Sequence, residues 1–181
     1  MKPTDVTIRI LSQDEVPQWW EMRLRALKEH PEAFGSDYET SRQGGYGHVV
    51  ERNFGLDRGM NAIFVAVDSQ GQMLSTAGVF GDTGKRSHIA YIVGVYTIPE
   101  ARVLGLARCV VTAAIDRCRT FPQIRQALIS VNADNASALH LYESLGFVAW
   151  GREPRAIALP DRFDDEIHLA LMLDENRETA L

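Results

Sequence analysis

Two strand-like segments and the amphipathic segment between them constrain the fold more than any other feature of this chain. Residues 88–98 are rich in β-branched and aromatic side chains, and the run ends at Pro99. From about Leu104 to Arg119, small and apolar residues recur every three or four positions, a spacing typical of a helix with one buried face. Residues 126–131 then form a second apolar run. Strand, helix and strand in this order predict a right-handed crossover between two parallel strands.

The rest of the chain adds strands and helices that would complete a mixed sheet. Further strands are expected at residues 6–10, 62–67, 73–80, 147–151 (extended toward 159) and 165–173. Further helices are expected from the capping-box sequence at 12–15 to about residue 28, near 47–56 and over 135–145. A short turn around residue 70 makes the strands on either side of it antiparallel. The predicted fold class is α/β: a mixed, mostly antiparallel sheet with one parallel βαβ crossover and flanking helices.

Length and composition indicate a single domain over residues 1–181. Of the 181 residues, 45% are hydrophobic and 24% are charged, which is enough apolar material for one core of ordinary size. The sequence contains neither an internal repeat nor a long linker, so we expect an ordered core over about residues 6–173. Residues 175–181 are polar and are expected to fray.

Charge, hydropathy and cysteine content exclude several classes of function. The formal net charge is -5 and no basic patch is visible, so we expect no binding to nucleic acid. No apolar run reaches the ~18 residues of a membrane span, and the first residues lack the apolar stretch of a signal peptide, so we expect a cytoplasmic protein that binds no membrane. Cys109 and Cys118 lie too far apart along one expected helix for a disulfide. No Cys/His cluster indicates a metal site.

Residues 95–107 carry the chemistry that the sequence indicates. A strand ends there at Pro99, a short turn follows, and a helix begins among small residues. The first backbone N–H groups of a helix have no partner within it and lie at the positive end of its dipole, so they bind phosphate well. Gly105 and Ala107 would keep side chains away from a diphosphate. The segment is neither a GxxxxGK-S/T loop nor a GxGxxG loop, so we expect a phosphate site of another kind.

Two motifs in this part of the chain resemble those of the GCN5-related N-acetyltransferase (GNAT) family. Residues 102–107, RVLGLA, match the family's acetyl-CoA signature R/Q-x-x-G-x-G/A. Residues 131–147, VNADNASALHLYESLGF, match its pattern V-x-x-x-N-x-x-A-x-x-L-Y-x-x-x-G-F, and the order of elements over residues 6–173 agrees as well. Val103 and Leu104 stand where many members carry a glycine and a basic residue. This departure weakens the attraction for phosphate but leaves the backbone amides in place.

The resemblance implies an acyl-CoA N-acyltransferase-like fold with one site for acetyl-CoA. The residues that it places around the cofactor are Val95, Tyr96, Thr97, Arg102, Val103, Leu104, Gly105, Leu106, Ala107, Arg108, Asn132 and Asn135. In that arrangement the end of the strand offers backbone groups to the pantetheine arm and to the thioester oxygen, and Arg102 screens phosphate charge. Asn135 is accounted for equally well as the N-cap of the following helix, Asn132 poses a similar choice, and Arg102 could be an ordinary exposed turn residue.

Tyr142 stands where the family usually places its general acid. A tyrosine hydroxyl, with a pKa of about 10, can donate a proton to a departing thiolate whose thiol has a pKa of about 8.5. The alternative is packing, because Leu139, Tyr142 and Leu145 share one helical face. The general base is not marked by any motif. The candidates near the expected cleft are His88, Tyr91, Glu39 and Glu166.

The part of the site that would bind the amine is less defined. By the same resemblance, residues 30–39 line the acceptor cleft, where Glu32, Asp37 and Glu39 could attract a cation. A solvated loop is the alternative for these three carboxylates. Residues 153–155 and 161–163 could shape the same cleft.

The resemblance and the residues together predict an N-acetyltransferase. It would transfer an acetyl group from its cosubstrate acetyl-CoA to a primary amine of a small molecule or peptide by direct attack, without a metal. The alternative is a module of the same fold that binds acyl-CoA without turnover. A nucleotide-binding α/β protein would need a glycine-rich loop after its first strand, which the sequence lacks. Whether the protein is a monomer or a homodimer is left open.

Overall fold

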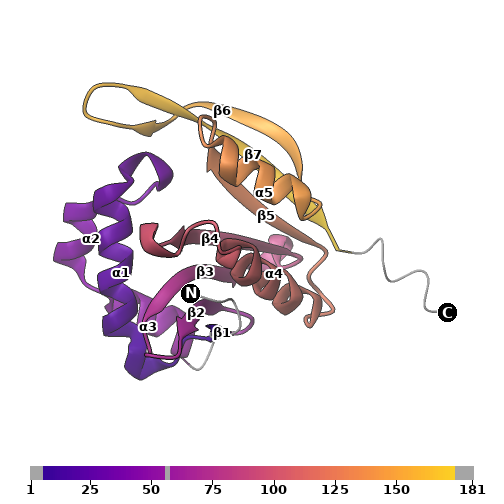
Figure 1. The fold of residues 1–181 in the computed structure, drawn as a ribbon. Coiled ribbons are helices and arrows are strands. Elements are labelled where there is room, and N and C mark those ends of the chain that lie inside the picture. The colour runs from indigo at the N-terminus through magenta and orange to yellow at the C-terminus, as the bar shows by residue number, and fades with distance from the viewer. Residues whose placement is uncertain (1–5, 56–57, 174–181) are drawn as a thin grey trace.

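One mixed sheet organises the computed structural model, which describes residues 6–55 and 58–173. Within these residues seven strands follow the order β1-β2-β3-β4-β5-β7-β6 (Figure 1). The strands are β1 (Val6–Ile10), β2 (Ala62–Asp68), β3 (Met73–Gly81), β4 (Ile89–Thr97), β5 (Gln126–Asn132), β6 (Val148–Ala158) and β7 (Phe163–Met172). Every described pair of neighbours is antiparallel except β4 and β5, which are parallel. The predicted fold class is therefore confirmed. The polar segment 175–181 lies outside the described residues.

Helices cover the sheet, and the long crossover helix is the one that the apolar spacing predicted. The α-helices are α1 (Val16–Glu29), α2 (Tyr38–Gly44), α3 (Gly47–Phe54), α4 (Leu106–Arg119) and α5 (Ala136–Ser144). The buried residues of α4 are Leu106, Val110, Val111, Ala114, Ile115 and Cys118. They pack α4 against β2, β3 and β4, and Figure 1 shows α4 and α5 in front of the sheet. No helix in 6–55 or 58–173 is both long and apolar enough to cross a bilayer.

The two cysteines both lie on α4 and are free. Cys109 is exposed, whereas Cys118 is buried against the sheet. Burial raises the pKa of the Cys118 thiol to about 12, so this thiol stays protonated and inert near neutral pH. The sequence prediction of two unpaired thiols is confirmed.

A divergence of β4 from β5 creates the space that matters for function. Among the described residues these strands pair only through Ile89–Tyr91 and Gln126–Leu128. Beyond that point β5 continues its ladder with β7, and β4 continues with β3. A bulge places Gly94 and Val95 of β4 opposite the single residue Ala77 of β3. Gly94 has a φ of +63°, a left-handed conformation that suits glycine and that bends the strand.

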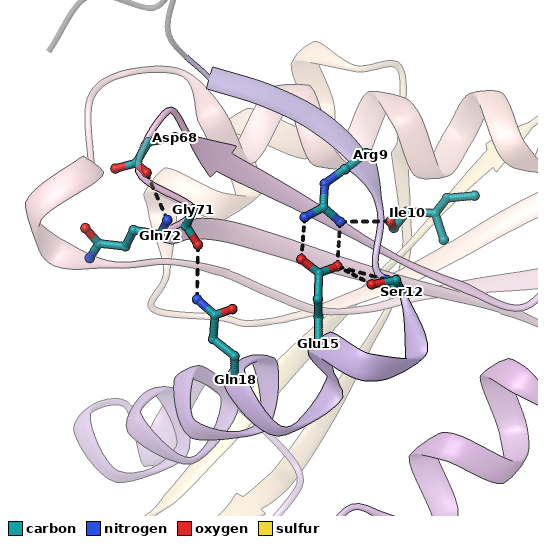
Figure 2. A network of polar contacts seen from close by, with 8 residues as sticks. All are labelled: Arg9, Ile10, Ser12, Glu15, Gln18, Asp68, Gly71 and Gln72. Atoms are coloured by element: carbon teal, nitrogen blue, oxygen red, sulfur yellow. Dashed lines mark hydrogen bonds and ion pairs between the residues drawn. The ribbon is translucent and has the colours of Figure 1, made fainter.

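A polar network ties β1 to the start of α1 (Figure 2). The Nη1 atom of Arg9 donates to Oε2 of Glu15 at 2.6 Å, and its Nη2 atom donates to Oε1 of the same carboxylate. The backbone N–H and the hydroxyl of Ser12 also donate to Oε2 of Glu15, at 3.1 and 2.6 Å. This is the capping box that the sequence predicted, strengthened by an arginine. The hydrogen bond from Arg9 is the largest cause that lowers the pKa of Glu15 to about 2.

The substitution Glu15→Gln is expected to lower the free energy of unfolding by about 1 kcal/mol at pH 7, because it removes one charge of a half-exposed ion pair and weakens the cap. Since the pKa of Glu15 is lowered from 4.5 to about 2 on folding, its contribution is present above about pH 4.5 and declines as the pH falls toward 2. Urea unfolding at pH 7 and pH 3 should therefore give a smaller difference between wild type and variant at pH 3.

The matched control is Glu21→Gln, because Glu21 is an exposed residue of α1, the helix that Glu15 precedes. We expect this variant to follow the wild type at both pH values. An equal destabilisation by Glu15→Gln at pH 7 and pH 3 would contradict the role assigned to the ion pair.

Candidate active site

A cavity of about 810 Å³ opens where β4 and β5 diverge; we call it the first cavity. The end of β4, the turn after Pro99, the start of α4, the end of β5 and helix α5 form its walls. The predicted site residues that line it are Val95, Tyr96, Thr97, Arg102, Val103, Gly105, Leu106, Ala107, Arg108, Asn132, Asn135 and Tyr142. Leu104 is the exception, because its side chain packs against the hydrophobic core instead.

The start of α4 presents a row of free backbone donors to this cavity. Gly105 is the N-cap, with a φ of +75°, and no side chain caps the helix. In the part of the chain that the structure describes, the amides of residues 103–108 donate to no protein acceptor; the amide of Cys109 is the first that does, to the carbonyl of Gly105 at 3.3 Å. Val103, fully exposed, has a φ of +61°, which strains a β-branched residue where glycine would fit.

Tyr142 reaches the same cavity from α5. Its side chain is buried, with 5% exposure, and its ring makes an edge-on contact with Phe147 at 6.2 Å between centroids. Within the described residues no hydrogen bond is made by its hydroxyl, although the residue lines the cavity. Burial raises the pKa of Tyr142 well above its usual value of 10, so the hydroxyl keeps its proton throughout the physiological range. Tyr142 is thus a packing residue whose hydroxyl is protonated and has no hydrogen-bond partner among the described residues.

A second cavity of about 440 Å³ adjoins the first. The residues common to both are Ala33, Phe34, Ile92, Val93, Gly94, Ile129 and Ser130. The two cavities therefore meet at the β4 bulge and at the point where β5 leaves β4. The other residues lining the second cavity are Arg23, Gly35, Ser36, Arg86, Tyr91, Leu128, Trp150, Glu166, His168 and Leu169. Two ligands could approach one point from these two openings.

This geometry agrees with what a comparison of family models finds. The model described as the acetyltransferase (GNAT) family matches residues 19–147, which is more than half of the chain. The chain belongs to the GNAT family. The family resemblance inferred from residues 102–107 and 131–147 is therefore confirmed.

Curated relatives of this GNAT chain are acetyltransferases and an acyltransferase by name. Mycothiol acetyltransferase of Renibacterium salmoninarum is 29% identical over 154 residues, which cover 82% of this chain and 42% of that protein. The L-amino acid N-acyltransferase MnaT of Escherichia coli is 28% identical over 116 residues, covering 63% of this chain and 67% of that one. The chain spans less than half the length of the mycothiol acetyltransferases it matches.

Solved structures confirm the GNAT fold. The structure of YncA from Salmonella typhimurium, solved with its cofactor acetyl-CoA, has a TM-score of 0.79 at 22% identity. The alignment covers 95% of this chain and 96% of YncA. At this level of identity the likeness establishes the fold and leaves the residues of the site to be judged from their own contacts.

The polar side chains around the first cavity of this GNAT chain have structural partners as well. Asn135 accepts the amide of Ala138 at 3.1 Å and so caps α5, the structural alternative that the sequence left open. Asn132 is buried and donates through Nδ2 to the carbonyl of Glu32 and to Asp164, both at 2.9 Å. It thereby joins the loop after α1, the end of β5 and the start of β7.

Arg102 is tied to the same loop. Its Nη2 atom lies 2.8 Å from Nε2 of His30, and its Nε donates to the carbonyl of Thr97 at 3.4 Å. The guanidinium is exposed and lines the first cavity, so it remains within reach of a phosphate there.

The structure separates the four candidates for the general base. Glu166 and Tyr91 line the second cavity, whereas His88 and Glu39 line neither cavity. The Tyr91 hydroxyl donates to Asp82 at 3.0 Å and accepts from Arg86, so it is already engaged. Glu166 makes no hydrogen bond or ion pair through its carboxylate with the described residues. Desolvation by burial raises the pKa of Glu166, a direction that suits a proton acceptor.

His168 is a site residue that the sequence analysis missed. Its Nδ1 atom lies 2.8 Å from Oγ of Ser130, its Nε2 atom lies 2.9 Å from Oε2 of Glu153, and its ring stacks on Trp150. The register of β5 with β7 places Ser130 opposite His168. No local motif marks this pairing, because the two residues are 38 positions apart in sequence.

Of the three acidic residues expected to attract the amine, the structure brings one to a cavity. Glu32 lines the first cavity. Asp37 caps α2 by accepting the amide of Thr40 at 2.8 Å, and Glu39 pairs with Arg42 on the same helix at 3.1 Å. Helix α2 therefore begins within residues 30–39, and the carboxylates of Asp37 and Glu39 stabilise that helix.

Proposed function

We propose that this GNAT chain transfers an acetyl group from acetyl-CoA to a primary amine by direct attack. The observation that carries the proposal is the row of free amides at residues 103–108, which opens onto a cavity that also holds the buried Tyr142. A diphosphate would supply the acceptors that these donors lack. The named relatives and the YncA complex with acetyl-CoA support the same cosubstrate.

Each wall of the first cavity would then have one task. The amides at the start of α4 hold the diphosphate, and Arg102 adds a positive charge beside it. Backbone groups of Val95–Thr97 hold the pantetheine arm along β4. Because the bulge at Gly94 interrupts the ladder, backbone N–H groups around it are placed to stabilise the oxyanion of the tetrahedral intermediate.

The proton transfers would use one residue from each cavity. The amine enters through the second cavity, where the Glu166 carboxylate accepts its proton. The neutral nitrogen attacks the thioester carbon and a C–N bond forms. The C–S bond then breaks, and the nitrogen loses its second proton to water as the amide forms. Tyr142 donates its proton toward the departing sulfur. Its raised pKa keeps the donor protonated and makes stabilisation of the sulfur by a short hydrogen bond more important than complete transfer.

A thermal-melt titration with CoA, followed by a thiol-release assay with acetyl-CoA and a panel of amines, tests this function. At a CoA concentration a hundred times its Kd, the free energy of unfolding should rise by about 2.7 kcal/mol, which a shift in Tm reports. Release of free CoA should depend on the amine. No shift at millimolar CoA would overturn the proposal.

The alternative, a module that holds acyl-CoA without turnover, predicts a different result in the same two assays. It requires tight binding of CoA with no thiol release for any amine. The protonated tyrosine in the first cavity and the unpaired carboxylate in the adjoining second cavity favour the enzyme over the module.

A further inference from the structure

A partly buried cation with one unsatisfied donor atom lies in the second cavity. Among the described side chains, Nη1 of Arg23 is the one buried nitrogen or oxygen atom that has no hydrogen-bond partner. Arg23 extends from α1, and its guanidinium stacks over the ring of Phe34 at 4.4 Å. Its Nη2 atom reaches Oγ of Ser36 at 3.4 Å, a long and weak contact.

Arg23 also lacks a counter-ion, whereas two more exposed arginines of the described residues have one. Arg25, on the same helix as Arg23, contacts Glu29 and Glu100, both at 2.9 Å. Arg9, on β1, pairs with Glu15. In the described residues no carboxylate lies within ion-pair distance of Arg23. Desolvation lowers the pKa of Arg23 to about 10, which still leaves it charged at neutral pH. A buried charge with an open donor is costly unless a ligand completes it.

The position of Arg23 relates this charge to the proposed chemistry. A methyl group built on Gly94 would lie 3.9 Å from Nη1 of Arg23, so the guanidinium borders the β4 bulge. Glu166 and His168 line the same cavity, and His168 contacts Glu153. The second cavity thus combines a cation beside the bulge with one carboxylate, that of Glu166, elsewhere in its wall.

Building on the proposed acetyl transfer, we infer that Arg23 binds a carboxylate of the acceptor, so that the substrate is a small amine carrying a carboxylate next to its amino group, as a free amino acid does. The planar guanidinium can hold both oxygens of a carboxylate, while the amino group faces Glu166. A polyamine would place a second cation near Arg23 and is disfavoured for that reason. A peptide N-terminus lacks the adjacent carboxylate.

Matched sets of acceptors test this inference with the wild-type protein. The sets are leucine, leucinamide and 3-methylbutylamine, and phenylalanine, phenylalaninamide and 2-phenylethylamine. Thiol release should show kcat/KM at least 50-fold higher for the amino acid of each set than for its amide or its decarboxylated amine. Amides and amines used as well as the amino acids, or release with polyamines alone, would overturn the inference while leaving acetyl transfer intact.

The variant Arg23→Met then identifies the residue responsible. We expect kcat/KM for the amino acids to fall by about 100-fold, mostly through KM, and kcat/KM for the amides to change by less than about threefold. Arg52→Met is the matched control, because Arg52 is also a partly buried arginine, stacks over Phe80 at 5.3 Å and lines neither cavity. It should leave the preference for amino acids unchanged.

Further measurements distinguish binding of the carboxylate by Arg23 from a structural role of this residue. If Arg23→Met does not fold, as judged by thermal melting and CoA binding, Arg23→Lys replaces it. The lysine keeps the charge but cannot make the bidentate contact with a carboxylate. We therefore expect this variant to show a reduced preference for acceptors that carry a carboxylate. Equal losses for amino acids and amides in a folded Arg23 variant would show a structural role and overturn the inference. Absence of both CoA binding and thiol release would instead count against the proposed function itself.

Discussion

Replacing Tyr142 with phenylalanine is expected to lower kcat by about 100-fold or more while the Kd for CoA changes little. The variant removes one oxygen atom that makes no hydrogen bond within the described residues, so the packing of α5 against Phe147 is kept. General acid catalysis typically contributes 10²–10⁴-fold to a rate. Steady-state thiol release gives kcat, and isothermal titration with CoA gives the Kd.

A suitable control is Tyr38→Phe, because Tyr38 is a partly buried tyrosine on α2 that lines neither cavity. Its kcat should equal that of the wild type. Should Tyr142→Phe keep full activity, the hydroxyl has no part in catalysis and Tyr142 is a packing residue alone. A parallel loss of CoA affinity and kcat would point to a change in the shape of the first cavity.

The substitution Ala107→Glu is expected to weaken CoA binding by about 100-fold while stabilising the fold. Ala107 lies in the first turn of α4 and lines the first cavity. Two unit charges about 5 Å apart repel by about 3 kcal/mol at an effective dielectric constant of about 20, which corresponds to this loss of affinity. The same carboxylate interacts favourably with the helix dipole, so the unfolding free energy should rise by about 0.3–1 kcal/mol. Calorimetric titration and urea unfolding measure the two effects.

Ala107→Gln separates charge from bulk, because glutamine has nearly the same size as glutamate. We expect it to bind CoA much more tightly than the glutamate variant, and the gap between the two should narrow at high salt. Equal Kd values for the two variants would attribute the loss to steric blocking. Unchanged binding in both would remove the start of α4 from the phosphate site.

Elements with a strong local signal were predictable from the sequence. The apolar stripe of α4, the capping box at Ser12 and the strand that ends before Pro99 all depend on residues close together in the chain. Helix α2 was not predicted, because its residues lack an apolar stripe and its stability comes from the cap at Asp37 and the pair between Glu39 and Arg42. Polar helices of this kind resemble loops in a sequence.

The candidate site divides in the same way. Most of the first cavity follows from two contiguous motifs and the strand end before them, and all but Leu104 of the residues predicted to bind the cofactor line it. The second cavity depends on contacts between distant segments: Ser130 with His168, and Arg23 with Phe34 and Gly94. Nothing in the sequence distinguishes Arg23 from Arg25, the other arginine of α1, because the unsatisfied Nη1 atom of Arg23 is a property of the folded chain.

Because β4 and β5 pair over only three residues, the sheet consists of two parts, β1–β4 and β5–β7, that are joined along a short seam. Beyond that seam, the hydrogen bond from Asn132 to the carbonyl of Glu32 ties the end of β5 to the loop after α1. A substrate bound between the two parts of the sheet would contact both of them and so link them. Amide hydrogen exchange at the seam should therefore slow on ligand binding more than exchange at the edge strands β1 and β6.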